Sequence, residues 1–190
     1  EIYNFKELAT KYKLNNLKST SDTEVVLELF EKYGVKIIPE FNGMFAFSIL
    51  DRVEKKVFLV RDRMGIKPLY VHKDKSALYF GSEIKAIKEL HENNESKMDV
   101  GNLHEWLYYG NTLGENTLYK NVKKLLPGHY AEVDMQTLHS VDYCYWSPSI
   151  PITKSRSIDK LIIENKILLE QAVKRQLISD VPVGVFLSGG

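Results

Sequence analysis

The sequence is poor in cysteine, has no surplus of charge of one sign, and lacks a long apolar run. The single cysteine, Cys144, excludes an internal disulfide framework and is compatible with a reducing cytosol. Lys and Arg number 26 against 25 Asp and Glu, so the charge pattern indicates no nucleic-acid partner. No apolar segment is long enough to cross a bilayer, and no signal-peptide pattern is visible. These absences predict a cytoplasmic protein that binds neither nucleic acid nor membrane.

Histidine and cysteine are present, but not in the spacing or surroundings that a metal site or a nucleophilic thiol needs. The five histidines show no paired ligand spacing, so we expect no structural zinc site and name no metal ligand. Cys144 lies among Tyr143, Tyr145 and Trp146 with no basic neighbour, so we expect a packed thiol and not a nucleophile.

Hydrophobic residues make up 44% of the 190 residues, which is enough for one domain or for parts of two. Polar Ser21 and Asp22 precede apolar residues at helical spacing, and Gly34 follows them, which predicts a helix over about 22–33. Short apolar runs joined by short polar segments predict antiparallel pairing. The expected strands are 43–50, 56–61, 69–72, 77–80 and one after a turn at 126–129, and further helices are expected at 82–90 and 99–110.

The character of the chain changes after residue 145. Residues 146–156 are polar and contain proline, so we expect a linker there between one domain at 1–145 and the start of another at 157–190. Ser157 is expected to cap an amphipathic helix, and 183–187 to form a short buried strand, as at the start of an α/β domain. The helix residues expected to face a core are Ile158, Leu161, Ile162, Leu168, Leu169, Ala172 and Val173.

Two charged or glycine-rich segments could carry chemistry. A strand that ends in Ser188-Gly189-Gly190 exposes successive backbone N–H groups to which a phosphate could bind, although an ordinary turn is an equally open interpretation. Arg61 and Asp62 end a predicted strand, and we interpret them as a structural salt bridge and not as catalytic residues.

Several motifs resemble the glutamine-hydrolysing asparagine synthetase family, and they occur in the family's order. Residues 179–190 resemble the lead into its pyrophosphate-binding loop. Residues 1–4, followed by 21–24, resemble the glutamine pocket of class II amidotransferases. The segments 43–47, 61–70, 82–87 and 126–130 resemble the same family, so the resemblance covers nearly the whole chain.

The resemblance implies a fold and a set of site residues. The expected fold is an α+β N-terminal-nucleophile glutaminase domain, an αββα sandwich incomplete at its N-terminus, followed by the start of an α/β PP-loop domain of the adenine-nucleotide α-hydrolase type. Glu1 and Asp22 would bind glutamine, with Asp22 holding its α-amino group, unless Asp22 is only a helix N-cap. Leu187, Ser188, Gly189 and Gly190 would bind ATP.

The resemblance also implies a reaction. The family's nucleophilic cysteine would lie upstream of Glu1, so we expect this chain to be an internal fragment without a catalytic residue and inactive alone. Its parent would hydrolyse glutamine and use the ammonia, ATP and Mg²⁺ to convert aspartate to asparagine through β-aspartyl-AMP. The partners that the resemblance implies are glutamine, aspartate and ATP, and a homodimer of the parent protein is compatible with it. Alternatives are a ligase of the family with another carboxylate or a sugar as acceptor, or a non-catalytic module.

Overall fold

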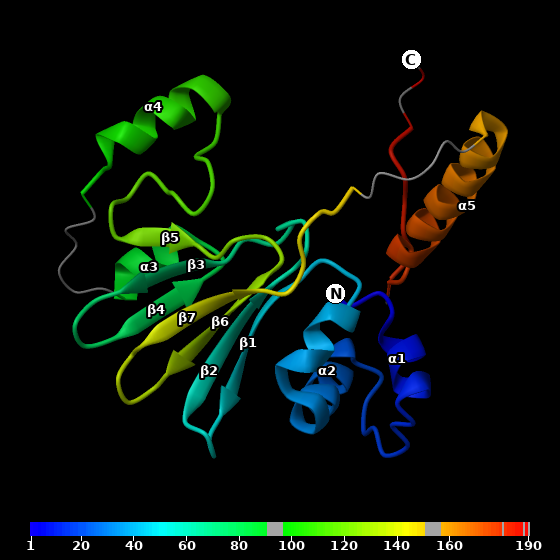
Figure 1. The fold of residues 1–190 in the computed structure, drawn as a ribbon, viewed down its shortest axis with the longest axis horizontal. Helices are drawn as coiled ribbons and strands as arrows, with labels where there is room; N and C mark the ends of the chain where they lie inside the picture. Colours follow the sequence, from blue (N-terminus) through cyan, green and yellow to red (C-terminus); the bar gives the residue numbers. More distant parts are fainter. Residues whose placement is uncertain (91–96, 151–156, 180, 188, 190) are drawn as a thin grey trace.

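The computed structural model describes residues 1–90, 97–150, 157–179, 181–187 and 189 (Figure 1). Within them, seven strands form two antiparallel sheets. The four-stranded sheet has the order β1-β2-β6-β7 and contains β1 (Ala46–Asp51), β2 (Lys56–Arg61), β6 (His129–Asp134) and β7 (Ser140–Cys144). The three-stranded sheet has the order β4-β3-β5 and contains β3 (Tyr70–Lys73), β4 (Leu78–Gly81) and β5 (Val122–Lys124).

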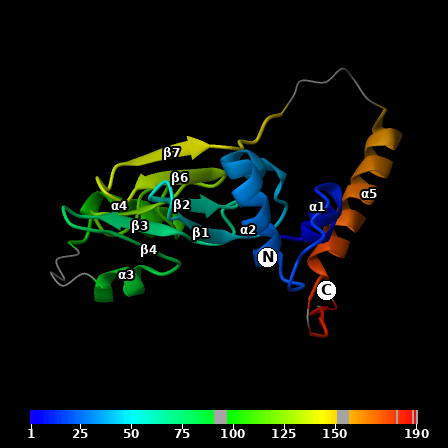
Figure 2. The same ribbon diagram turned by 90° about the horizontal axis from the view of Figure 1, so that it is seen from below.

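The helices lie outside the two sheets (Figures 1 and 2). Helices α1 and α2, with the 3₁₀ helix η1, lie on the side of β1, and α3 packs against β3 and β4. Helix α5 stands apart from both sheets. The bounds are α1 Phe5–Lys11, α2 Asp22–Tyr33, η1 Gly34–Glu40, α3 Ile84–Leu90, α4 Val100–Tyr109 and α5 Ile158–Gln176.

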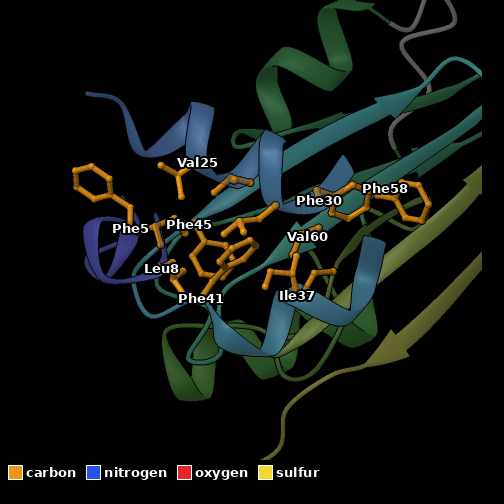
Figure 3. Close-up of a cluster of buried hydrophobic side chains, with 13 residues drawn as sticks. Phe5, Leu8, Val25, Phe30, Ile37, Phe41, Phe45, Phe58 and Val60 are labelled. Atoms are coloured by element: carbon orange, nitrogen blue, oxygen red, sulfur yellow. The ribbon is translucent and has the colours of Figure 1, made fainter. Parts of the chain in front are cut away.

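Strand β2 separates two hydrophobic cores because its side chains alternate between the two faces of the sheet. Phe58 and Val60 point into a cluster that contains residues of α1, α2 and η1, which Figure 3 shows in close-up. Leu59, between them in sequence, belongs to a second cluster with Leu69, Leu125 and Ala131. Leu69 directly precedes β3 and Leu125 directly follows β5 of the other sheet, and Ala131 lies in β6. Helix, sheet, sheet and helix are thus layered in the expected αββα order.

Helix α2 forms where the sequence predicts it. Ser21 is the N-cap, and its Oγ accepts a hydrogen bond from the Thr23 N–H at 3.2 Å. Gly34 ends the helix with a φ of 58°, a conformation that glycine adopts at little cost. The apolar positions at helical spacing, Val25, Val26, Leu29 and Phe30, are all buried in the first core.

Arg61 and Asp62 are structural residues, but their hydrogen bonds go to the backbone and not to each other. Both side chains are buried, and Asp62 is fully so. Arg61 donates to the carbonyl oxygens of Gly65, Lys67 and Leu125 at 2.9, 2.9 and 2.6 Å. Asp62 accepts from the N–H groups of Phe45, Met64, Ile66 and Lys67 at 2.9–3.2 Å. The pair therefore ties the turn after β2 to its surroundings, and the predicted mutual salt bridge is wrong.

The part of the chain after residue 145 differs most from the sequence prediction. Residues 183–187 form no strand and are exposed, because a strand needs a hydrogen-bonded neighbour and none of the described strands lies beside them. Helix α5 begins after Ser157 as expected, but the Ser157 side chain makes no capping bond. The α5 residues expected in a core are exposed, since no described element covers that stripe. Most of the predicted linker, 151–156, lies outside the described residues.

Two further details differ from expectation. Four short or weakly patterned elements were not predicted from the sequence, namely α1, η1, β5 and β7. Cys144 is exposed and its thiol lies 3.3 Å from the Trp146 carbonyl oxygen, so the predicted packed thiol is wrong. Cys144 ends β7, an edge strand whose last four residues are all exposed.

Among the described helices, none combines the length and the apolar character that crossing a membrane requires.

Candidate functional site

The first three residues are held against the segment that leads into β1. The Tyr3 N–H donates to the Asn42 carbonyl at 2.8 Å, and the Met44 N–H donates to the Glu1 carbonyl at 3.1 Å. Ile2 and Gly43 form the antiparallel bridge between these bonds. A Cβ on Gly43 would lie 2.1 Å from the Glu1 carbonyl oxygen, so this close approach requires glycine. The pairing fixes the position of Glu1.

Asn4 strengthens the same pairing, a role that was not predicted from the sequence. Its Nδ2 donates to the Glu40 carbonyl and its Oδ1 accepts from the Asn42 N–H, both at 2.9 Å. One side chain thus satisfies two backbone groups of the facing segment, 36 and 38 residues away. The only sequence signal for it was its place in the motif at residues 1–4.

Asp22 meets the N-terminal segment at the start of α2. It is the first residue of the helix, and its Oδ2 accepts a hydrogen bond from the Ile2 N–H at 2.8 Å. Its Oδ1 has a long contact of 3.4 Å with the Thr23 hydroxyl. The N-cap is Ser21, so the alternative in which Asp22 caps the helix is wrong. The carboxylate is oriented by the backbone and keeps one oxygen available to a ligand, while its role in binding glutamine stays a prediction.

Glu1 and Asp22 line one open groove of about 1450 Å³. The loop 19–21 and the beginning of α2 form its wall beside Asp22, and residues 44–50, which include most of β1, line the rest. Ile178 and Val181 from the segment after α5 also lie along it, and Ile178 packs against the first core. The structure thus brings the two predicted glutamine-binding residues to the same cavity.

Charged side chains of both signs line the groove: Glu1 and Asp22 are acidic, and Lys6 and Lys67 are basic. Beside the groove, burial, together with the carboxylates of Glu1 and Asp62, raises the pKa of the Tyr3 hydroxyl. Within the lining, Glu1 and Asp22 are the groups that could pair with a cationic ligand group.

The predicted nucleotide-binding residues are not brought into a comparable site. Leu187 is 92% exposed, and a Cβ on Gly189 would meet nothing within 4 Å. Ser188 and Gly190 lie outside the described residues. The described residues at this end form no phosphate cradle by themselves, and the ATP-binding roles stay a prediction. Across the described ranges, no group of three or more His, Cys, Asp or Glu could hold a metal ion.

Family comparisons identify the class to which this arrangement belongs. The family described as glutamine amidotransferase domain matches residues 1–146, and the family described as asparagine synthase matches residues 164–190. The chain therefore belongs to the glutamine amidotransferase domain family. Over its whole length it is also similar to proteins named glutamine-hydrolysing asparagine synthetases, as the resemblance of its motifs predicts.

The relatives are considerably longer than this chain. It is 37% identical over 199 residues to asparagine synthetase 2 of Bacillus subtilis, 34% over 193 residues to asparagine synthetase 3 of that organism, and 34% over 192 residues to asparagine synthetase 2 of Arabidopsis thaliana. All of this chain is covered in each case, but only 27%, 31% and 28% of the relatives. The chain spans about a third of the length of these relatives or less.

Solved structures confirm the fold. The chain is similar to glutamine phosphoribosylpyrophosphate amidotransferase of B. subtilis, with a TM-score of 0.51, 16% identity, and coverage of 77% of this chain and 28% of that one. A structure of the allosteric regulatory enzyme of purine biosynthesis has the same TM-score at 18% identity, with 77% and 27% covered. At these identities the likeness shows the fold alone, and that fold is the expected N-terminal-nucleophile type.

Proposed function

We propose that the protein containing this chain is a glutamine-hydrolysing asparagine synthetase. Glutamine and water would give glutamate and ammonia in the glutaminase domain. ATP and aspartate would give β-aspartyl-AMP and pyrophosphate in a second domain, and ammonia would then displace AMP to give asparagine. Support comes from the two family matches along one chain and from the names of the similar proteins. These names also favour aspartate over another carboxylate or a sugar as the acceptor.

The contribution of the described residues would be to bind glutamine. The observation that carries this proposal is the Asp22 carboxylate, oriented by the Ile2 N–H and facing the same groove as Glu1. An ammonium that leaves water needs a fixed carboxylate partner, and a charge-assisted bond to Asp22 would supply one. Glu1 would contribute a second acidic group near the α-amino end of the substrate.

ATP, Mg²⁺ and the boundary between the domains remain part of the proposal. Residues 187–190 would approach the phosphates of ATP, because glycine leaves backbone N–H groups accessible to an anion. Mg²⁺ would neutralise the phosphates, with ligands that we do not assign. The glutaminase domain would comprise 1–145, the linker 146–156 and the synthetase domain would begin at 157. The cytoplasm is the proposed location, and a homodimer is compatible with the proposal.

The test is an assay of asparagine formation by the whole protein with aspartate, ATP and Mg²⁺. Both glutamine and ammonium chloride should support the reaction, and AMP and pyrophosphate should form in step with asparagine. Formation of ADP in place of AMP, or amidation of a different acceptor in preference to aspartate, would contradict the proposal.

A further inference from the structure

Glu24 lies one turn inside α2, three residues after the N-cap Ser21. In a capping box the glutamate at this position bonds back to the N–H of the N-cap residue. Here it reaches further. Its Oε1 accepts from the Lys18 N–H at 2.7 Å, and its Oε2 accepts from the Ser19 N–H at 2.7 Å and from the Ser19 hydroxyl at 2.6 Å.

The bonds of Glu24 continue into the helix cap. The Ser19 hydroxyl that donates to Glu24 also accepts from the Ser21 N–H at 3.2 Å. The Ser21 hydroxyl in turn accepts from the Thr23 N–H. Both oxygens of Glu24 are therefore engaged, and the carboxylate holds the loop 18–21 in one conformation against the start of α2.

The same contacts keep Glu24 ionised. The N–H of Lys18 and the hydroxyl and N–H of Ser19 hold the pKa of the Glu24 carboxyl below its ordinary value. A protonated carboxyl could not accept all three bonds equally, since one oxygen would then carry a hydrogen. The three bonds from the loop are therefore best satisfied by the ionised carboxylate of Glu24.

This loop borders the proposed glutamine pocket, whereas Glu24 does not. Ser19, Thr20 and Ser21 line the groove together with Glu1 and Asp22, and Glu24 is absent from its lining. Ser21 is also the residue directly before Asp22, so a shift of the loop would move the start of α2 and the Asp22 carboxylate with it.

We infer that Glu24 is a positioning residue for substrate binding, which acts by holding loop 18–21 as the wall of the pocket beside Asp22. The inference rests on the proposed function in that it takes glutamine to be the ligand of this groove. If Glu24 only stabilised the helix, its bonds should lie at the helix start, as the capping bond of Ser21 does. The bonds of Glu24 leave the helix and end in the loop.

The test compares Glu24→Ala and Glu24→Gln with Glu28→Gln in the whole protein. Glu28 lies one turn further along α2, is exposed, and is not among the residues that line the groove, so its variant controls for loss of a negative charge on the helix. Glu24→Ala should raise the KM for glutamine by about tenfold, because a displaced wall misplaces the substrate contacts. The kcat at saturating glutamine, and synthesis from ammonia, should change by less than about twofold.

Glu24→Gln keeps one acceptor oxygen and should raise the KM for glutamine less than Glu24→Ala does. If the alanine variant fails to fold, the glutamine variant carries the test, with its thermal midpoint measured beside the KM. An unchanged KM for glutamine in a folded Glu24 variant, or equal losses from glutamine and from ammonia, would overturn the inference. Asp22→Asn, measured in parallel, reports on the proposed binding of glutamine in this groove: an unaffected Asp22 variant would contradict that binding, whereas an unaffected Glu24 variant alone contradicts only this inference.

Discussion

The carboxylate of Asp22 accepts a hydrogen bond from the backbone N–H of Ile2 at 2.8 Å, across 20 residues of sequence. The bond joins the first residue of α2 to the segment that carries Glu1. Because it uses only Oδ2, it orients the carboxylate without consuming both of its oxygens. A substrate ammonium could therefore bind to a group that is already fixed in place.

Asp22→Asn in the whole protein should impair the use of glutamine and spare the use of ammonia. The amide oxygen can still accept from the Ile2 N–H, but the charge opposite the ammonium is lost, at roughly 2–5 kcal/mol if that pair is buried in the complex. Steady-state kinetics with each nitrogen donor measure the difference. Asp159→Asn, at an exposed position in the first turn of α5, is the control for charge at a helix start. Glutamine kinetics close to wild type would leave Asp22 without the proposed role.

Gly43→Ala should disturb the N-terminal pairing. Its Cβ would lie 2.1 Å from the Glu1 carbonyl oxygen, and both are fixed by backbone bonds, so the segments must separate. We expect a loss of about 1–3 kcal/mol of stability, as for other overpacked sites, and a raised KM for glutamine. Chemical denaturation measures the first effect. Gly184→Ala, where a Cβ would meet nothing within 4 Å, should be nearly neutral. Equal stability of the two variants would argue against the close approach at Gly43.

Asp62→Ala should destabilise the glutamine amidotransferase domain more than any single surface change. Four backbone N–H groups around a fully buried carboxylate would lose their acceptor. Each buried donor left unsatisfied costs about 1–3 kcal/mol before the structure relaxes, so the total should exceed about 3 kcal/mol. Asp51→Ala removes the acceptor of two exposed turn N–H groups and is the control, expected to cost about 1 kcal/mol or less. Similar midpoints in urea for both variants would refute the prediction.

The contribution of Glu24 to stability should disappear in acid. Its folded-state pKa is lowered by the bonds from Lys18 and Ser19, so the folded state binds fewer protons than the unfolded state near that pKa. The stabilisation is complete above the ordinary glutamate pKa of about 4.3 and is lost as the pH falls through the folded-state value. Denaturation of wild type and Glu24→Gln across this range should show a gap that narrows with falling pH. A gap that is constant with pH would contradict the assignment of these bonds to the charged form.

Gly189→Val tests the second proposed site independently of the first. A branched side chain next to the proposed phosphate position should abolish asparagine synthesis from both nitrogen donors, while glutamine hydrolysis continues without coupled synthesis. Glutamate release and asparagine formation, measured in the same reaction, separate the two activities. Gly184→Ala serves again as the control, since it lies five residues upstream in the same segment. Normal synthesis by Gly189→Val would remove the argument for a phosphate site at 187–190.

Local signals explain which elements could be predicted from the sequence. Helix α2 was predicted with its bounds because Ser21 directly precedes it, the apolar spacing runs through it and Gly34 directly follows it. Residues 183–187 have equally clear apolar character, but a strand is defined by its neighbour, and no sequence signal within the segment supplies one. Cys144 was expected to pack because its neighbours are aromatic. In the structure the last four residues of the edge strand β7 are all exposed, Cys144 among them, and the sequence pattern does not reveal this.

For the candidate site too, part of the arrangement could be predicted from the sequence and part could not. The motifs identified Glu1 and Asp22 as residues of one site, and the structure places both on one groove. What pattern could not provide are the bonds between distant segments: Asp22 to Ile2, and Asn4 to the backbone at Glu40 and Asn42. Such contacts depend on how the helices pack against the loop before β1. Local sequence patterns do not predict this tertiary packing.

The alternation of side chains along β2 has a consequence for folding. Leu59 and Val60 are adjacent in sequence, fully buried, and members of different cores. If β2 slipped by one residue against β1 and β6, the two side chains would exchange cores, and Arg61 would move away from the turn carbonyls that it binds. Misaligned pairing would thus damage both sides of the sheet at once. Only the native alignment serves both cores, so the register of β2 is specified from both faces of the sheet.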